Sequence, residues 1–458
     1  MKTLEEHRNQ LKTISDYAFS HGQEFLGIEK MLRIAKGTAS AKVKKIFFQK
    51  CHEGFKLAQE LLIDEIQYYQ SLYRTSNQDL KVSRTERNKE KQKKLENDLQ
   101  IVETRLSALS HIADGIAYQL LGGRIHVMRR LHIGKQGNSF LEFSNLSHTK
   151  AIVDQINKNP DDFAFISDLS SFIHIGDLLV FSNGEVKIVE LKEGKVNQEV
   201  SGFLDNVNIK QDTLDDAKLE EKFDKHTAKQ IKRNVRQRKR GMQFEEVVNN
   251  DKGIDPATGE FIHIPTPAVD SVYYNDVLGE MEDTLKSQNW AYQYLPGGVH
   301  IGMYKDDALL MAKFAIEHIV KEKTPNFILV DWQSIIDQLS EPLFSKPLSP
   351  DFIIDILTGR VRVIIALDCD ELIDEFNRFG LNAKWLSQKE TMRLKQTNKN
   401  IQGLFEVNGR AISVAKEDGT KITIYGGIIS KILYDNIMPA SIASQIASTD
   451  YNQMIVDE

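Results

Sequence analysis

The sequence predicts an α/β protein in which a helical region is followed by two regions that mix strands and helices. Apolar residues recur at helical spacing through residues 1–104. Strand-like runs separated by helices fill residues 105–304, and alternation of strand and helix continues through residues 305–458. At 458 residues and 41% hydrophobic content, the chain is long enough for two to four domains, and we expect these three regions to be domains.

The first region is expected to be all helical. Apolar residues recur in steps of three and four between Phe55 and Tyr73, and a heptad seam runs from Leu95 to Ala113. Such a seam suits an antiparallel helical hairpin or a short coiled coil. Packing of the two segments within one chain is the simpler interpretation, and a homodimer through these helices is the alternative.

The middle region is expected to contain the main sheet. We expect its first strand over residues 124–134 (RIHVMRRLHIG) and later strands over 261–274 and 291–304, with a helix over 275–288 between them. Taken with the other elements expected in this region, the order along the chain is helix, three strands, helix and a further strand.

The most informative segment is a predicted β-hairpin over residues 175–192 (IGDLLVFSNGEVKIVELK). Two apolar runs flank Asn183–Gly184, the dipeptide that a two-residue type I′ turn favours. With these two as turn residues, strand pairing runs outward from Ser182 and Glu185.

Continued outward, this register places Asp177 opposite Glu190. Two bare carboxylates about 5 Å apart repel by roughly 3 kcal/mol at an effective dielectric near 20, so the pair predicts a bound cation. Strand alternation puts Lys192 on the face of Glu190 and turns Leu191 to the core. Such oxygen ligands suit Mg²⁺ or Mn²⁺, whereas a surface salt bridge from Lys192 to one carboxylate is the simpler alternative.

Asp177, twelve intervening residues and then Glu190-Leu191-Lys192 resemble the D…ExK signature of the PD-(D/E)XK nuclease superfamily. The resemblance covers roughly residues 105–245, and Gly176 stands where the family name has proline. It implies a restriction-endonuclease-like core, a mixed sheet with helices around it.

The resemblance also implies roles for these residues. In this superfamily the aspartate and the glutamate bind the metal, here Asp177 and Glu190, and the carbonyl of Leu191 is a further ligand. Lys192 would orient or activate the attacking water. The implied activity is metal-dependent hydrolysis of nucleic acid, DNA more than RNA, by an endonuclease of a bacterial phage-defence or restriction type. An RNase, or a non-catalytic nucleic-acid-binding or partner-binding protein on a degenerate nuclease scaffold, stays open.

Two further acids are weaker candidates for the same site. The superfamily often supplies an acid from the helix before the first strand, which would be Asp114. Asp168 precedes Asp177 by nine residues, although capping of a turn is the simpler role for it. His174 has the opposite strand parity to Asp177 and is expected to face away as a structural residue.

A basic helix is expected over residues 224–241 (DKHTAKQIKRNVRQRKRG), capped by Thr227 and ended by Gly241. Its apolar residues fall on one stripe, which would pack on the sheet, and its cations fall on the opposite stripe. A solvated charged face is the alternative to phosphate contact. The candidate nucleic-acid-binding residues are Lys229, Gln230, Arg233, Arg236 and Arg240.

In the last region, Asp331 and Asp368 each follow an apolar run. The carboxyl ends of parallel strands often carry ligand sites, but helix capping explains both residues sufficiently. Two hairpins are expected at Asn408–Gly409 and Asp418–Gly419.

Composition excludes several other classes of protein. The net charge is −6, so the basic helix is a local feature. Only Cys51 and Cys369 are present, which argues against a disulfide framework or a zinc site. The N-terminus lacks the apolar core of a signal peptide, and no apolar run is long enough to span a bilayer. We therefore expect a cytoplasmic protein without a membrane partner.

Overall fold

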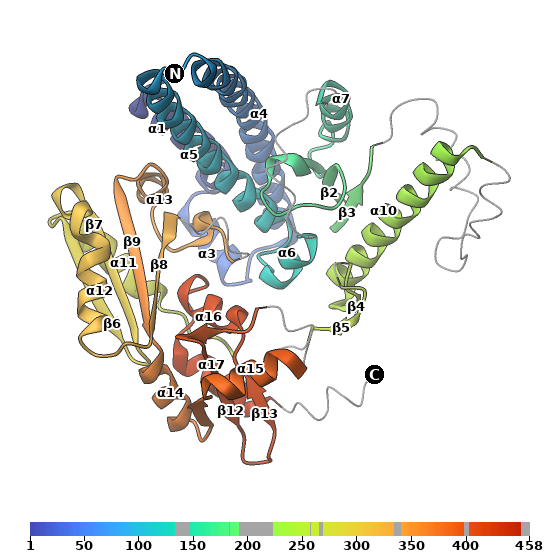
Figure 1. Ribbon diagram of the computed structural model, residues 1–458. Coiled ribbons are helices and arrows are strands. Elements are labelled where there is room, and N and C mark those ends of the chain that lie inside the picture. The colour runs from blue at the N-terminus through green and yellow to red at the C-terminus, as the bar shows by residue number, and fades with distance from the viewer. Residues whose placement is uncertain are drawn as a thin grey trace. The chain divides into compact units, whose positions relative to one another are not determined.

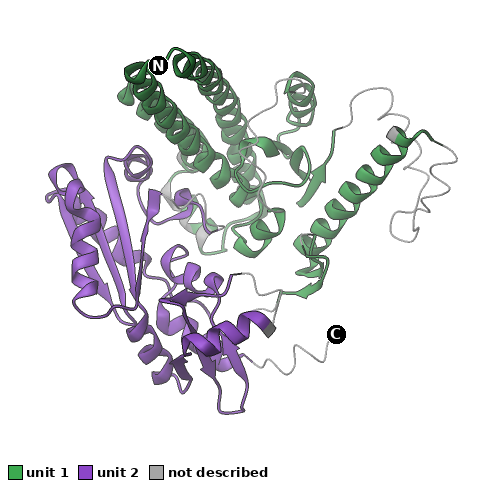
Figure 2. Cartoon of the chain, viewed as in Figure 1, with its two compact units in different colours: residues 1–265 green, residues 266–458 purple. Residues whose placement is uncertain are grey.

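The computed structural model is of mixed α/β class and divides into two compact units, residues 1–265 and 266–458 (Figures 1 and 2). The residues that it describes are 1–132, 146–182, 184–191, 223–256, 258–264, 269–333, 340–397 and 403–449. The division differs from the three expected domains. The helical region shares a unit with the candidate hairpin, and a boundary at 304 would cut through the strand Val299–Lys305.

The first unit begins with helices, as predicted. Two long ones, α4 and α5, form an antiparallel hairpin (Figure 1). The predicted packing within one chain is confirmed, because Leu62, Ile66, Leu106 and Leu109 from the two stripes are all buried. The helices are α1 (Leu4–Ser15), a π-helix (Asp16–Ser20), α2 (His21–Leu26), α3 (Ile28–Ala35), α4 (Ala41–Thr85) and α5 (Lys89–Leu120).

The segment expected to be the first strand is helical instead, as α6 (Ile125–Leu131). Its buried residues are Val127, Met128 and Leu131, which lie one and three residues apart, as on one side of a helix. The next helix is α7 (Leu146–Ile156).

The first strand of the sheet is β1 (Phe163–Ile166), and all four of its residues are buried. It pairs antiparallel with β2 (Leu178–Ser182), which pairs antiparallel with β3 (Glu185–Val189). The predicted hairpin register is confirmed from Ser182 opposite Glu185 to Leu178 opposite Val189.

Helix α10 (Lys225–Asn250) follows β3 in the described chain and packs on it. The described elements run helix, three strands, helix and strand, but the first strand is β1 and not residues 124–134, and the last is β4 (Lys252–Ile254), where no strand was expected. However, β4 pairs with β5 (Phe261–His263) and not with the three-stranded sheet. All strand pairs between described residues are antiparallel, so these residues do not form the expected mixed sheet.

The second unit contains a four-stranded antiparallel sheet in the order β6-β7-β9-β8. The expected strand over 291–304 is the β6–β7 hairpin of this sheet and so lies outside the candidate nuclease core. Helix α12 covers one face, where Ile316 and Val320 pack against Tyr304 and Ile364 (Figure 1). The elements are α11 (Asn275–Leu285), β6 (Trp290–Leu295), β7 (Val299–Lys305), α12 (Ala312–Lys321), β8 (Phe327–Asp331), α13 (Pro350–Leu357), β9 (Val361–Asp368) and α14 (Cys369–Arg378).

A smaller antiparallel sheet completes the second unit. Both predicted turns are confirmed: Asn408 and Gly409 have φ of 52° and 73°, and Gly419 has φ of 86°. The elements are β10 (Asn382–Trp385), α15 (Gln388–Thr397), β11 (Glu406–Val407), β12 (Arg410–Ala415), β13 (Lys421–Thr423), α16 (Gly426–Leu433) and α17 (Pro439–Ser448).

Asp331 and Asp368 do not form a common ligand site. Because β8 and β9 are antiparallel, the two residues lie at opposite ends of the sheet. Asp331 accepts a hydrogen bond from Arg362 Nε at 3.0 Å, and Asp368 caps α14. No helix in the described part of the chain is both long and apolar enough to cross a bilayer.

Candidate metal and nucleic-acid site

The main chain departs from the predicted register just before β2. The N–H of Asp177 donates to the carbonyl of Val189 at 2.9 Å, and its own carbonyl accepts from the N–H of Ser167 at 3.0 Å. Val189 is also the partner of Leu178, so two residues of one strand oppose one residue of the other, as in a β-bulge. The predicted direct pairing of Asp177 with Glu190 is therefore wrong by one residue.

Gly176 is the residue that permits this bulge. Its φ is +76°, and a β-carbon at this position would overlap with Cγ2 of Ile188. Proline fixes φ near −65° and cannot adopt this conformation. The departure from the family signature at this position is thus a structural requirement of the chain.

The side chain of Asp177 nevertheless reaches the Glu190 segment. Its Oδ2 accepts a hydrogen bond from the N–H of Leu191 at 2.5 Å. Asp177 is exposed, whereas Glu190 and Leu191 are half-buried. The two acids therefore lie on neighbouring segments at the same end of the hairpin. Lys192, the third residue of the signature, lies outside the described residues.

This arrangement is compatible with one divalent ion. Mg²⁺ is commonly held by one or two carboxylates and completes its shell with water and substrate phosphates. Asp177 and Glu190 can supply the two carboxylates. Within the described ranges, no group of three or more histidine, cysteine, aspartate or glutamate residues gathers to hold a metal. The carbonyl of Leu191 as a ligand remains a prediction, because the group in contact with Asp177 is its N–H.

Asp114 has a different role from the predicted one. It is 5% exposed and accepts hydrogen bonds from Ser170 Oγ at 2.6 Å and from the N–H and Oγ of Ser171 at 2.8 and 2.5 Å. Burial raises the pKa of this carboxyl to about 6, although the three hydrogen bonds act in the opposite direction. Asp114 therefore anchors the segment that leads to Asp177 and belongs to no metal-holding group of described residues.

The other polar candidates near the hairpin lie in connecting segments. Asp168 is exposed in a 3₁₀ turn (Ser167–Leu169) in which the N–H of Ser170 bonds to the carbonyl of Ser167. The ring of His174 packs against that of His132, with centroids 4.4 Å apart. The main-chain N–H of His174 donates to the carbonyl of Leu131 at 2.9 Å. His174 therefore has a structural position, whereas the turn-capping role of Asp168 remains a prediction.

Helix α10 begins earlier and ends later than its sequence signals, Thr227 and Gly241, indicate. Asp224, and not Thr227, caps the first turn, because its carboxylate accepts from the N–H and Oγ1 of Thr227 at 3.1 and 2.6 Å. Gly241 lies inside the helix, where its Cα faces Ile188 of β3, and a β-carbon there would be 3.8 Å from that side chain. That distance is an ordinary van der Waals contact, so the position does not require glycine, and buried Phe244 continues the apolar stripe beyond it.

The predicted amphipathic character of α10 is confirmed. Ala228 and Ile231 are buried, whereas Lys229, Arg233 and Arg236 are exposed. Gln230 and Arg240 are half-buried. Considering described residues alone, none of the three exposed cations forms an ion pair. The outer side of α10 therefore presents cationic side chains that are accessible to an anionic partner.

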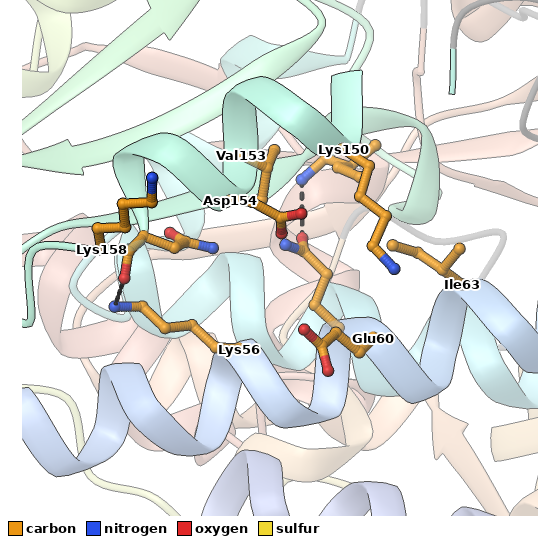
Figure 3. Close-up of a pocket in the computed structure, with 10 residues that line it drawn as sticks. Lys56, Glu60, Ile63, Lys150, Val153, Asp154 and Lys158 are labelled. Carbon is orange, nitrogen blue, oxygen red and sulfur yellow. Dashed lines mark hydrogen bonds between the residues drawn. The ribbon is translucent and has the colours of Figure 1, made fainter. Parts of the chain in front are cut away.

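Sequence reasoning did not identify a cavity between α4, α7 and β1 (Figure 3). Its volume is about 230 Å³, and charges of both signs line it, among them Lys56, Glu60, Lys150 and Asp154. Lys56 Nζ donates to the carbonyl of Asn157 at 2.6 Å and so caps the end of α7. The residues that line this cavity are of ordinary surface types and come from segments about 100 positions apart in the chain. The sequence therefore contains no local signal for the cavity.

The chain has no match among known protein families, curated proteins or solved structures. The resemblance to the nuclease superfamily therefore rests on the D…ExK residues and on the hairpin that carries them.

Proposed function

We propose that this protein is a metal-dependent nuclease of the PD-(D/E)XK type, and that DNA is its substrate. The observation that carries the proposal is the hydrogen bond from the Leu191 N–H to Asp177 Oδ2, at 2.5 Å. It joins the aspartate of the signature to the segment that contains Glu190. The bulge and the separate pairing of β4 distinguish this hairpin from a standard core of the superfamily.

Each residue of the candidate site would have a separate role. Asp177 and Glu190 would hold Mg²⁺ or Mn²⁺, which when bound lowers the pKa of a coordinated water and neutralises charge on the phosphate. The ammonium of Lys192 would stabilise the negative charge that develops in the transition state. Asp114 holds Ser170 and Ser171 and so positions the segment that leads to Asp177.

The accessible cations of α10 support a nucleic-acid substrate. Lys229, Arg233 and Arg236 lie on the side of the helix opposite the buried stripe that packs on β3. Phosphate contacts from such a row predict binding that weakens steeply with salt. The biological role that we propose is bacterial restriction or phage defence, because the resemblance to the superfamily implies it.

The test is a cleavage panel that crosses Mg²⁺, Mn²⁺ and EDTA with supercoiled DNA, linear duplex, single-stranded DNA and RNA. Activity should require metal and be lost in Asp177→Ala, Glu190→Ala and Lys192→Ala. Glu185→Ala and Lys187→Ala are matched controls near the turn of the same hairpin, where both side chains are largely exposed. A parent protein inert under all conditions, or equal losses in the controls, would overturn the proposal.

A second candidate is a non-catalytic binding protein on a degenerate nuclease scaffold. It is favoured by the lack of a three-residue metal-holding group among the described residues. This candidate predicts salt-dependent nucleic-acid binding without turnover, unaffected by Asp177→Asn. Cleavage restricted to RNA in the same panel would instead identify an RNase.

A further inference from the structure

The turn between α4 and α5 carries a concentration of positive charge. The segment 81–94, here called the cationic tip, contains seven basic residues and two acidic ones in a chain whose net charge is −6. All seven basic residues are exposed. They are Lys81, Arg84, Arg87, Lys89, Lys91, Lys93 and Lys94.

Little of this charge is neutralised within the protein. Arg84 pairs with Glu96 at 3.2 Å, and both side chains are more than half exposed. The other six basic residues form no ion pair with any residue that the structure describes. A cluster of accessible like charges repels itself and gains by meeting an anionic partner.

The tip has a defined geometry. The side chain of Asn88 accepts from the N–H of Lys91 at 3.1 Å and so caps α5, while its N–H donates to the carbonyl of Ser83 at 3.0 Å. Gln92 Nε2 donates to the same carbonyl at 3.0 Å. The lysines that follow Asn88 are thus held on a helix that begins at a fixed point.

Arg87 occupies an unfavourable backbone conformation at this turn. Its φ is +57°, which costs a residue with a β-carbon about 1 kcal/mol or more and favours glycine or asparagine. Backbone geometry therefore does not account for arginine here, whereas a role for its charge does.

The length of α5 sets the spacing between the tip and the segment that leads to the candidate site. Asp114 of α5 bonds Ser171, six residues before Asp177, and lies 25 positions after Lys89 on the same helix. At a rise of about 1.5 Å per residue, these positions are about 37 Å apart along the helix. One turn of B-form DNA spans about 34–36 Å.

We propose that the cationic tip binds the phosphate backbone of duplex DNA, about one helical turn from the strand that the β2–β3 hairpin engages. The choice of DNA rests on the proposed function, whereas the choice of a polyanion rests on the charge itself. The contact would be independent of base sequence, because lysine and arginine on phosphates position a duplex without reading it.

The test measures binding of a labelled duplex of about 30 base pairs, three turns long, by fluorescence anisotropy in EDTA across a range of salt concentrations. The tip variant carries Lys89→Gln, Lys91→Gln, Lys93→Gln and Lys94→Gln, since glutamine preserves helix propensity. The matched control removes four exposed lysines of the second unit by Lys313→Gln, Lys321→Gln, Lys384→Gln and Lys389→Gln. Thermal unfolding of both variants establishes that each is folded.

The tip variant should bind at least about tenfold more weakly near 100 mM salt, and the slope of log K against log salt should be shallower by about 2 or more. The control should stay within about twofold of the parent. Equal losses in both variants would overturn the proposal, because only net charge would then matter. Unchanged DNA binding, with lost binding to phosphatidylserine vesicles, would also overturn it and identify a membrane surface as the partner.

This test is separable from the test of the proposed function. Asp177→Ala should abolish cleavage and leave binding in EDTA intact. A parent protein that binds through the tip but never cleaves DNA would overturn the nuclease proposal and leave the tip proposal standing.

Discussion

Gly176 lies so close to Ile188 that no β-carbon fits between them, and its φ of +76° belongs to the left-handed region. Gly176→Ala should therefore lower the free energy of unfolding through both backbone strain and overlap. Gly184→Ala is a matched control, because its φ is +82° but nothing lies within 4 Å of the added carbon. We expect Gly176→Ala to cost about 2 kcal/mol more than the control in urea unfolding.

The overlap itself can be tested by a double-mutant cycle. Ile188→Ala removes Cγ2, so it should cost less in the Gly176→Ala background than in the parent. Additive losses would show that the strain comes from φ alone.

The side-chain amide of Gln59 completes the hydrogen bonding of β1. Its Nε2 donates to the carbonyl of Ala164 at 3.0 Å, and its Oε1 accepts from the N–H of Ile166 at 2.9 Å. Gln59→Ala leaves two buried main-chain groups without these partners and should cost about 2–5 kcal/mol in urea unfolding. Gln49 lies on the same helix as Gln59, and Gln49→Ala, which removes a single contact to Asp161, should cost less than about 1 kcal/mol. Equal costs would contradict this role of Gln59.

Asp114 should make stability depend on pH. Burial raises its pKa from 3.8 to about 6 in the folded state, so between these values the folded protein binds more protons than the unfolded chain. The contribution of Asp114 to stability therefore falls as pH rises, by about 1 kcal/mol between about pH 5 and pH 7. Asp114→Asn can still accept from Ser170 and Ser171 but cannot titrate. The difference in unfolding free energy, variant minus parent, should grow by that amount over this interval, and a constant difference would refute the assignment.

Metal binding at Asp177 and Glu190 can be detected without catalysis. If the dissociation constant is about 1 mM, Mn²⁺ at about 10 mM should stabilise the folded protein by about 1.4 kcal/mol. The shift in thermal or urea unfolding should disappear in Asp177→Asn and in Glu190→Gln. It should persist in Glu185→Gln, and a shift that survives all three substitutions would place the ion elsewhere.

Local sequence signals predicted several elements because short-range chemistry determines them. The apolar alternation on either side of the predicted Asn183–Gly184 turn determined the register of β2 and β3 from Ser182 opposite Glu185 onward, although Asn183 itself lies outside the described residues. The stripe of α10 placed Ala228 and Ile231 inside. Asn408 and Gly409 formed the expected turn for the same reason.

Other features depend on contacts that a local pattern does not contain. Residues 125–131 alternate partly like a strand, yet packing of Val127, Met128 and Leu131 selects a helix. Asp224 and Thr227 are both good capping residues, and only the structure distinguishes them.

The bulge at the candidate site is a further case of this kind. It depends on the approach of Gly176 to Ile188, twelve positions away, and this approach moved Asp177 by one residue relative to Glu190. The sequence therefore predicted which two segments carry the acids, but it did not predict which residues lie directly opposite each other.

The amide that borders β1 also has a consequence for solubility. Exposed strand edges are the places where polypeptides associate into intermolecular sheets and fibrils, and the segment FAFI has the apolar, uncharged composition of such places. A helical side chain occupies main-chain positions of that edge, so the protein resists self-association there without a charged or proline residue in the strand. Loss of this one side chain would expose a nucleus for aggregation as well as weaken the fold.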